Sequence, residues 1–251
     1  IYGCLVGSEM CIRDRSNLGF TNRRASKNYI SENKIFVNSK LVKSDIAIKD
    51  NDIIEINGSQ HIADLSAPLE VIMYHKPLGQ ICSNVSSEKN DSVFKNLPTR
   101  KKGKWIMIGR LDVNTSGLLL FSNNGYFSNI LSHPSSGIDR EYLCRVYGDI
   151  SNEKISKLLK GVKINGLESN FSDIVEVKKK RLSKNHWFYV CLFSGKNREV
   201  RKLWATQELT VNRLIRLRYG SIELPKTLKP GEWKKVNNRD IQNLKKIYKV
   251  I

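Results

Sequence analysis

GRLDVNTSGLLLFSNNG, residues 109–125, places a polar loop directly before an apolar run. The apolar residues 118–121 predict a buried strand, and the polar residues 122–125 are a strong turn signal. A second apolar run, residues 105–108, comes just before the loop. The pattern therefore predicts a polar loop that is bracketed by glycines and held between two buried strands.

This loop contains one carboxylate, Asp112, close to Arg110. Loops that rigid strands hold in place often carry catalytic groups. Because Asp112 is not half of a visible acid pair, the two-carboxylate chemistry of glycoside hydrolases gains no support. From the residues alone, Asp112 is a catalytic group, one member of a structural ion pair, or a turn former.

Segments farther along the chain predict further strands and helices. Alternation over residues 142–147 is typical of a strand, and residues 237–251 place apolar side chains on one side of a helix. Residues 200–204 put three apolar side chains on one helix face, with Arg201 beside that face and able to face a cleft.

Residues 213–219 are expected to form another strand. Since alternate side chains of a strand lie on opposite faces, Leu214, Arg216 and Arg218 should share one face. This placement puts arginines next to apolar groups rather than in a loose tail.

The first sixty residues divide into a short head and a small module. Residues 1–15 hold two of the five cysteines and no lysine, and we expect them not to belong to the native protein; an ordinary helix of odd composition is the alternative. Residues 21–32 predict a helix with a basic side. Short β-branched runs from residue 35 to residue 56 predict a small sheet beside it, and a polar linker places the module's end near residue 64.

Charge and composition restrict the partners. Of 251 residues, 43 are Lys or Arg and 24 are Asp or Glu, which gives a net charge of +19. Such an excess favours a polyanion, with nucleic acid first and an anionic membrane surface second. No apolar run approaches the roughly 20 residues that cross a bilayer. The cysteines form no CxxC pair and the four histidines lack ligand spacing, so we expect no zinc site, no disulfide framework and a reducing cytosol.

Residues 17–58 resemble the S4 RNA-binding domain. The resemblance rests on GFTNRR at residues 19–24, IFVN at residues 35–38 and IIEI at residues 53–56. That family starts with another helix just upstream, so the resemblance implies an S4 domain without its first helix. It also implies that Arg23, Arg24 and Lys27 contact RNA phosphates.

The run at residues 109–125 closely resembles the signature of the RsuA/RluB group of RNA pseudouridine synthases. Four further stretches agree in order and spacing: YHKPLG at 74–79, DREYL at 139–143, GKNREVRKLW at 195–204 and RLIRLRYG at 213–220. The implied fold is α+β, with an S4-type domain at residues 16–63 and a catalytic domain at residues 64–251. The catalytic domain is expected to have a mostly antiparallel mixed sheet flanked by helices. His75 departs from the pattern, because the family usually has Asn there.

The resemblance implies an isomerase that converts a uridine in RNA to pseudouridine, after flipping it out of the stack, with no metal or other cofactor. It assigns the essential carboxylate to Asp112, stacking on the target base to Tyr142, an ion pair with the aspartate to Arg201, and a wall of the uridine pocket to Leu214. RNA contacts are expected at Arg23, Arg24, Lys27, Lys76, Arg110, Asn114, Thr115, Arg198, Arg216 and Arg218.

Three stretches are most similar to the members of this group that act on large-subunit ribosomal RNA: residues 105–121, 140–148 and 195–205. The expected protein is therefore a monomer in the bacterial cytoplasm whose partner is 23S ribosomal RNA. Two alternatives stay open: the 16S-specific member of the same group, and a ribosome-assembly factor that binds RNA but has lost catalysis. An intact set of Asp112, Tyr142 and Arg201 argues against the second.

Overall fold

A computed structural model describes residues 34–42, 49, 51–63, 68–83, 86–87, 90–100, 104–177 and 184–248. The expected head at residues 1–15 and the expected helix at 21–32, with Arg23, Arg24 and Lys27, lie outside these ranges. The chain divides into two compact units, one of residues 1–71, 98–107 and 121–129, the other of residues 72–97, 108–120 and 130–251.

The first unit contains a small antiparallel sheet with the order β2-β1-β3-β4. Its strands are β1 (Ile35–Val37), β2 (Lys40–Leu41), β3 (Ile53–Ile56) and β4 (Ser59–Ile62). β1 and β3 were predicted. β4 was missed, because the predicted linker began inside its polar sequence. The S4 assignment and the boundary near residue 64 stay predictions, since the helix at 21–32 and residues 64–67 are not described.

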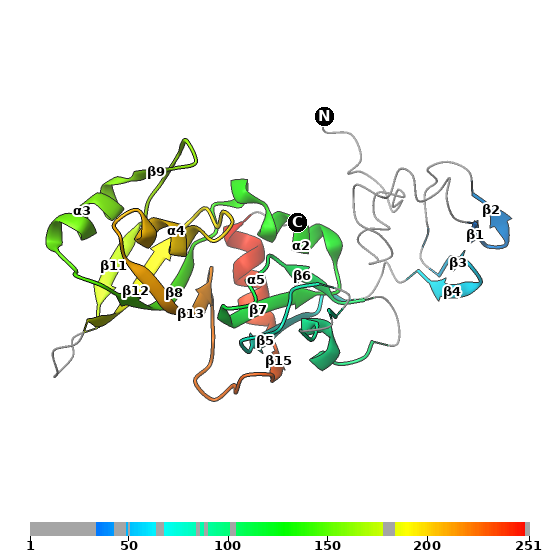
Figure 1. Cartoon of the computed structure of the whole chain (residues 1–251). Helices are drawn as coiled ribbons and strands as arrows, with labels where there is room; N and C mark the ends of the chain where they lie inside the picture. Colours follow the sequence, from blue (N-terminus) through cyan, green and yellow to red (C-terminus); the bar gives the residue numbers. More distant parts are fainter. Residues whose placement is uncertain are drawn as a thin grey trace. The chain divides into compact units, whose positions relative to one another are not determined.

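The main sheet of the second unit has the strand order β11-β12-β8-β13-β7-β5-β15, with β14 paired to β13. β13 and β7 run parallel, whereas β11, β12, β8 and β13 pair antiparallel in succession, as does β15 with β5. The predicted mixed, mostly antiparallel sheet is therefore confirmed (Figure 1). The strands involved are β5 (Val71–Lys76), β7 (Ser116–Ser122), β8 (Arg140–Tyr147), β11 (Asp173–Glu176), β12 (Asn185–Leu192), β13 (Thr210–Tyr219), β14 (Ile222–Glu223) and β15 (Trp233–Lys235).

The remaining elements connect or cover these strands. They are β6 (Ile106–Ile108), β9 (Val162–Ile164), β10 (Leu167–Ser169), α2 (Gly125–Ser132), α3 (Asn152–Lys160), α4 (Glu199–Ala205), α5 (Asn238–Ile247) and the 3-10 turns η2 (Val93–Asn96) and η3 (Pro134–Ser136). The two strands predicted around the polar loop are present. Every residue of β7 is buried, whereas in β6 only Ile108 is fully enclosed.

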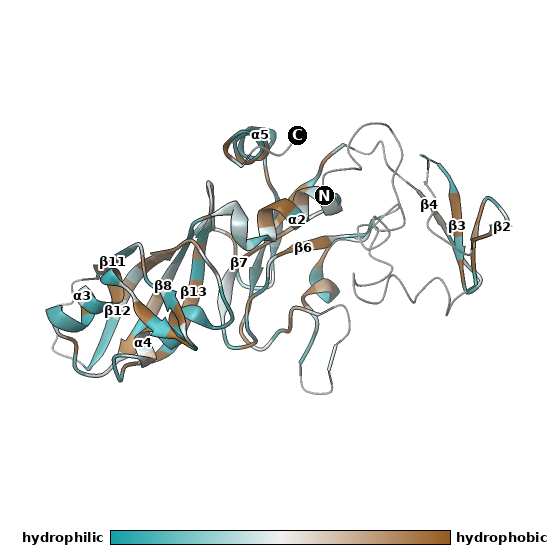
Figure 2. Cartoon of the chain, turned by 90° about the horizontal axis from the view of Figure 1, so that it is seen from above, coloured by the Kyte–Doolittle hydropathy of each residue, from teal (hydrophilic) through white to brown (hydrophobic). Residues whose placement is uncertain are grey.

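α4 covers one face of the main sheet with the apolar side that its sequence predicted. Val200, Leu203 and Trp204 are buried, and the Trp204 ring lies 4.9 Å from the ring of Phe188 on β12. Seen from above, α5 lies on the opposite side of the sheet from α4, over β7 (Figure 2). Its buried side chains Ile241 and Leu244 sit on the predicted apolar side of the helix.

β13 carries two irregularities that the alternating pattern did not predict. Its pairing with β8 shifts between Val211 and Arg213 and again between Arg216 and Arg218. A bulge adds one residue to one strand and so changes which face the following side chains take. Arg216 pairs with Tyr142 and Arg218 with the adjacent Glu141, so the two arginines lie on opposite faces. The prediction that they share one face is wrong for this reason.

Candidate functional site

The second unit contains a cleft of about 490 Å3. Its walls come from the polar loop after β6, from β8 and β13, and from the segment before α4. Asp112, Tyr142 and Leu214 all line it. On β8 and β13, Tyr142 pairs with Arg216 and Cys144 pairs with Leu214. Side chains of directly paired residues, and of residues two positions apart on a strand, lie on the same face of a sheet. Tyr142 and Leu214 therefore share one face. Three residues predicted from distant parts of the sequence therefore meet in one cavity.

Lys76, at the end of β5, ties down the loop that carries Asp112. Its Nζ is completely buried and donates to the main-chain oxygens of Asp112 at 3.1 Å, Thr115 at 2.8 Å and Pro77 at 3.1 Å. Burial lowers the pKa of Lys76 to about 8, against the opposing influence of Cys82 and Asp112. The predicted phosphate contact of Lys76 is corrected, because a fully enclosed ammonium cannot reach RNA.

Arg201 fixes the same loop from α4. Its Nη2 donates to the main-chain oxygen of Asn114 at 2.8 Å, and its Nη1 donates to that of Val211 at 2.6 Å. Burial lowers the pKa of Arg201, Arg198 lowers it further, and the charge of Asp112 raises it. Among the described residues, no hydrogen bond or ion pair joins the guanidinium to the Asp112 carboxylate. The predicted direct ion pair is replaced by a clamp on the main chain.

The remaining carbonyl of the turn is held as well. The oxygen of Val113 accepts a hydrogen bond from the amide of Gly79 at 2.9 Å, and the amide of Thr115 donates to the oxygen of Asp112 at 3.0 Å. The main-chain oxygens from Asp112 to Thr115 therefore all have donors. Among the described residues, the half-buried carboxylate of Asp112 has no hydrogen-bond or ion-pair partner, so its oxygens remain available to a ligand in the cleft.

A glycine permits the close approach of the two parallel strands behind this loop. Gly117 has a φ of +108°, and a Cβ there would lie 2.2 Å from the main-chain oxygen of Arg216. No side chain fits at this point. Arg216 in turn is 2% exposed and donates from Nε to the oxygen of Leu118 at 2.7 Å.

Several other predicted RNA contacts are also structural. Arg216 is enclosed, with its guanidinium 5.1 Å from the centre of the Tyr219 ring, and Thr115 is 2% exposed. Arg218 forms ion pairs with Asp139 and Glu141. Burial alone would lower the pKa of Arg218, but the bonds to these two carboxylates outweigh it and raise the pKa above its ordinary value. The predictions of RNA contact at these three residues are corrected, because their polar groups are enclosed or already paired.

Arg110, Asn114 and Arg198 remain exposed, as an RNA contact requires. Arg110 and Arg198 both line the cleft, Arg110 from the loop after β6 and Arg198 from the segment before α4. Lys196 also lines it, although the sequence had not singled it out; its Nζ donates to the main-chain oxygen of Glu168 at 2.7 Å and to Ser169 Oγ at 3.0 Å.

Glu199 is the residue whose role sequence reasoning missed most clearly. It is 3% exposed, and its carboxylate accepts hydrogen bonds from Ser194 Oγ at 2.6 Å and from the amides of Gly195 at 2.9 Å and Lys196 at 2.8 Å. These contacts hold residues 194–196, which precede Arg198 and include two residues of the cleft wall. The available signal was an acidic residue at the start of a helix, just after a glycine-containing turn.

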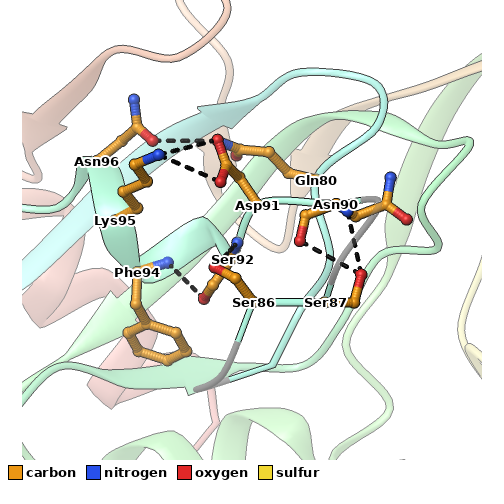
Figure 3. Close-up of polar contacts among 9 residues, drawn as sticks. All are labelled: Gln80, Ser86, Ser87, Asn90, Asp91, Ser92, Phe94, Lys95 and Asn96. Carbon is orange, nitrogen blue, oxygen red and sulfur yellow. Dashed lines mark hydrogen bonds and ion pairs between the residues drawn. The ribbon is translucent and has the colours of Figure 1, made fainter.

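A further wall of the cleft comes from Ile81 and Cys82, which the sequence had also not singled out. Cys82 Sγ accepts from the amide of Leu111 at 3.3 Å, and burial raises the pKa of this thiol. The segment that follows is held by short polar contacts: Gln80 Nε2 to Asn96 Oδ1 at 3.1 Å, the Ser92 amide to Ser86 Oγ at 3.0 Å, and Lys95 to Asp91 at 3.2 Å (Figure 3).

The volume of the cleft lies within the range of about 300–1,000 Å3 that small-ligand pockets occupy. It offers the Asp112 carboxylate, an aromatic ring, apolar walls and cations at its rim, whereas the second lining carboxylate, Glu199, is already hydrogen-bonded. The described residues contain no group of three or more His, Cys, Asp or Glu that could hold a metal ion. No described helix is both long and apolar enough to span a membrane.

Comparison with known proteins gives a consistent result. Residues 70–206 match the RNA pseudouridylate synthase family. A ribosomal large subunit pseudouridine synthase B of Buchnera aphidicola subsp. Acyrthosiphon pisum is 40% identical over 94% of this chain and 96% of that protein. The protein of that name from Vibrio cholerae is 38% identical over 96% of this chain and 75% of its own length. A solved pseudouridylate synthase shares the fold, with a TM-score of 0.63 and 22% identity, over 92% of this chain and 96% of that one.

Proposed function

Since this chain belongs to the RNA pseudouridylate synthase family, we propose that it isomerises a specific uridine of 23S ribosomal RNA to pseudouridine, with Asp112 as the essential carboxylate. The substrate follows from the names of the relatives. The observation that carries the role of Asp112 is its position: it is the one carboxylate of a clamped loop, and it faces a cleft in which no described residue pairs with its oxygens.

The reaction breaks the bond between N1 of the base and C1′ of the ribose, turns the base, and joins C5 to C1′. The proton on C5 leaves and N1 gains one, so the atoms balance. An ionised carboxylate can serve this sequence by attacking the sugar or by removing a proton. Either role needs accurate placement, which the clamped main chain of Asp112 provides.

The target uridine must leave its stack to enter the cleft, which costs a few kcal/mol. Tyr142 can offset part of this, because stacking on an aromatic ring contributes about 1–3 kcal/mol per base. Leu214 supplies an apolar wall, and Arg110, Asn114 and Arg198 are placed at exposed positions for phosphate or sugar contacts. The protein acts as a monomer in the bacterial cytoplasm without a cofactor, and residues 16–63 add an RNA-binding module with Arg23, Arg24 and Lys27.

Replacement of Asp112 tests this proposal directly. Asp112→Asn keeps the size of the side chain but removes its charge, so one pseudouridine, that of the target position, should disappear from the large-subunit RNA of cells that carry only this variant. The matched control is Asp91→Asn, which removes an exposed carboxylate paired with Lys95 outside the cleft. Pseudouridine mapping of both ribosomal RNAs gives the readout. Persistence of the modification with Asp112→Asn would remove Asp112 from catalysis, and loss confined to small-subunit RNA would reassign the substrate.

A further inference from the structure

The main sheet has a second face, turned away from the cleft. We define the back face as the set of side chains on β11, β12, β8 and β13 that alternate with the side chains facing the cleft. Strand pairing aligns them in rows, and two of these rows lie between the row of Tyr147 and Thr210 and the row of Asp173, Cys191, Glu141 and Arg218. The first row is Trp187, Arg145 and Arg213; the second is Val175, Tyr189, Leu143 and Ile215.

Much of the back face is open to solvent. Val175 is 50% exposed, Tyr189 is 39% exposed, and Arg213 is exposed as well. α4 packs on the other face, and α5 lies over β7 in both views rather than over β8 and β12 (Figures 1 and 2). Within the described part of the chain, no helix covers these two rows.

The row of Trp187, Arg145 and Arg213 contains two positive charges and no acidic side chain. Arg145 and Arg213 stand directly opposite each other on neighbouring antiparallel strands, an arrangement in which like charges repel. Neither takes part in an ion pair with any described acidic residue, and the buried Nε of Arg145 has no hydrogen-bond partner. Glu141, the nearest acid along β8 on this face, is occupied by Arg218. Two opposed arginines without counterions suit a bound polyanion.

Aromatic rings stand beside these arginines. The Arg145 guanidinium lies 5.9 Å from the centre of the Trp187 ring. Tyr189 follows Trp187 by two residues on β12 and lies in the neighbouring row. Cations that follow a phosphate backbone, interleaved with rings that accept bases, are the elements of surfaces that bind single-stranded nucleic acid.

We propose that the back face binds a second, single-stranded segment of the RNA substrate, with phosphates at Arg145 and Arg213 and an unpaired base on Tyr189. This inference rests on the proposed function, which supplies the RNA. It adds a contact on the opposite side of the sheet from the reacting uridine. A long RNA would therefore be held at two places, and a short one that only fills the cleft would be held at one.

The test compares Arg145→Gln/Arg213→Gln with the parent protein on a long fragment of large-subunit RNA. Loss of two single-strand phosphate contacts should weaken binding about tenfold and reduce the slope of log K against log salt by about 1.4. The turnover number should not change. The control Lys226→Gln/Arg239→Gln removes the same charge from exposed positions outside the back face and should leave both quantities unchanged.

Tyr189→Ser provides a variant that keeps the charge. It should weaken binding of the long RNA without altering the salt slope, because a stacking contact releases no counterions. A short stem-loop that fits the cleft should be modified equally well by all these variants, which separates this inference from the proposed function. Unchanged binding of the long RNA by both back-face variants would overturn the inference. Weakening seen only when ribosomal proteins are present would assign the surface to a protein and would overturn it as well.

Discussion

The buried ammonium of Lys76 donates a hydrogen bond to the main-chain oxygen of Asp112, 3.1 Å away, and not to the Asp112 carboxylate. Arg201 acts in the same way two residues later, at the oxygen of Asn114. Both cations therefore fix the backbone beneath the carboxylate and act on its charge only through space. This arrangement leaves the carboxylate oxygens available for substrate while the loop is held rigid.

Lys76 should make turnover sensitive to alkaline pH. Below its pKa of about 8, the ammonium has a proton for each of its three carbonyl acceptors; above that pH, the neutral amine has two N–H groups for three acceptors. The rate of the chemical step should therefore fall as pH rises through about 8. Lys76→Arg should move this fall to higher pH. Single-turnover rates from pH 6 to pH 10 are the measurement, and an identical profile in Lys76→Arg would contradict this origin.

Lys76→Met should slow the chemical step about 100-fold, since small displacements of a catalytic group have effects of this size. Binding of RNA should remain, because the enclosed Lys76 ammonium has no access to phosphates. Filter binding beside single-turnover kinetics separates the two quantities. Weakened binding with an unchanged rate would instead support the phosphate contact that the sequence suggested.

Arg201→Lys should also slow the chemical step, again about 100-fold, with RNA affinity retained. A single ammonium cannot reproduce the planar fork that reaches the oxygens of Asn114 and Val211 together. Lys202→Gln is the control, because it removes a positive charge from the next position of the same helix. A rate for Arg201→Lys that equals that of the control would show that charge alone matters here.

Glu199→Ala should destabilise the protein by about 2–3 kcal/mol, because three donors lose their charged acceptor. Glu199→Gln should be much milder, since an amide oxygen can still accept from the two main-chain amides while its NH2 group donates to Ser194. Thermal unfolding gives the order of stability. Glu153→Ala, at an exposed carboxylate paired with Lys157, should leave the melting temperature unchanged. Equal losses for Ala and Gln at position 199 would refute this account.

Gly117→Ala should cost about 2–5 kcal/mol, because the new methyl group meets the main chain of Arg216 and φ is positive. Gly137 also has a positive φ, of +58°, but nothing lies within 4 Å of the Cβ that Gly137→Ala would add, so about 1 kcal/mol is expected there. Urea unfolding of both variants distinguishes the clash from the backbone strain. Similar losses at the two positions would mean that the strands separate easily at Gly117.

Local patterns in the sequence were sufficient for most elements of the catalytic region. Apolar runs predicted β7, alternation predicted β8 and β13, and helical spacing predicted the buried side of α4. These succeeded because the periodicity of buried side chains is a property of a few neighbouring residues. The loop between two glycines also identified Asp112, and the structure places it in one cleft with Tyr142 and Leu214.

The partners of the cations were decided by the tertiary structure alone. The sequence predicted RNA contacts for Lys76 and Arg216 and an ion pair with Asp112 for Arg201. Each of the three instead donates to a main-chain oxygen far away in the sequence: 36 residues for Lys76, 98 for Arg216 and 87 for Arg201. The charge of such a side chain implies that it needs an acceptor, but it does not determine which acceptor it will have. Folding pairs these three with main-chain oxygens and leaves Arg145 and Arg213 without a counterion among the described residues. The pairing of distant strands, including the bulges of β13, sets which face each side chain takes.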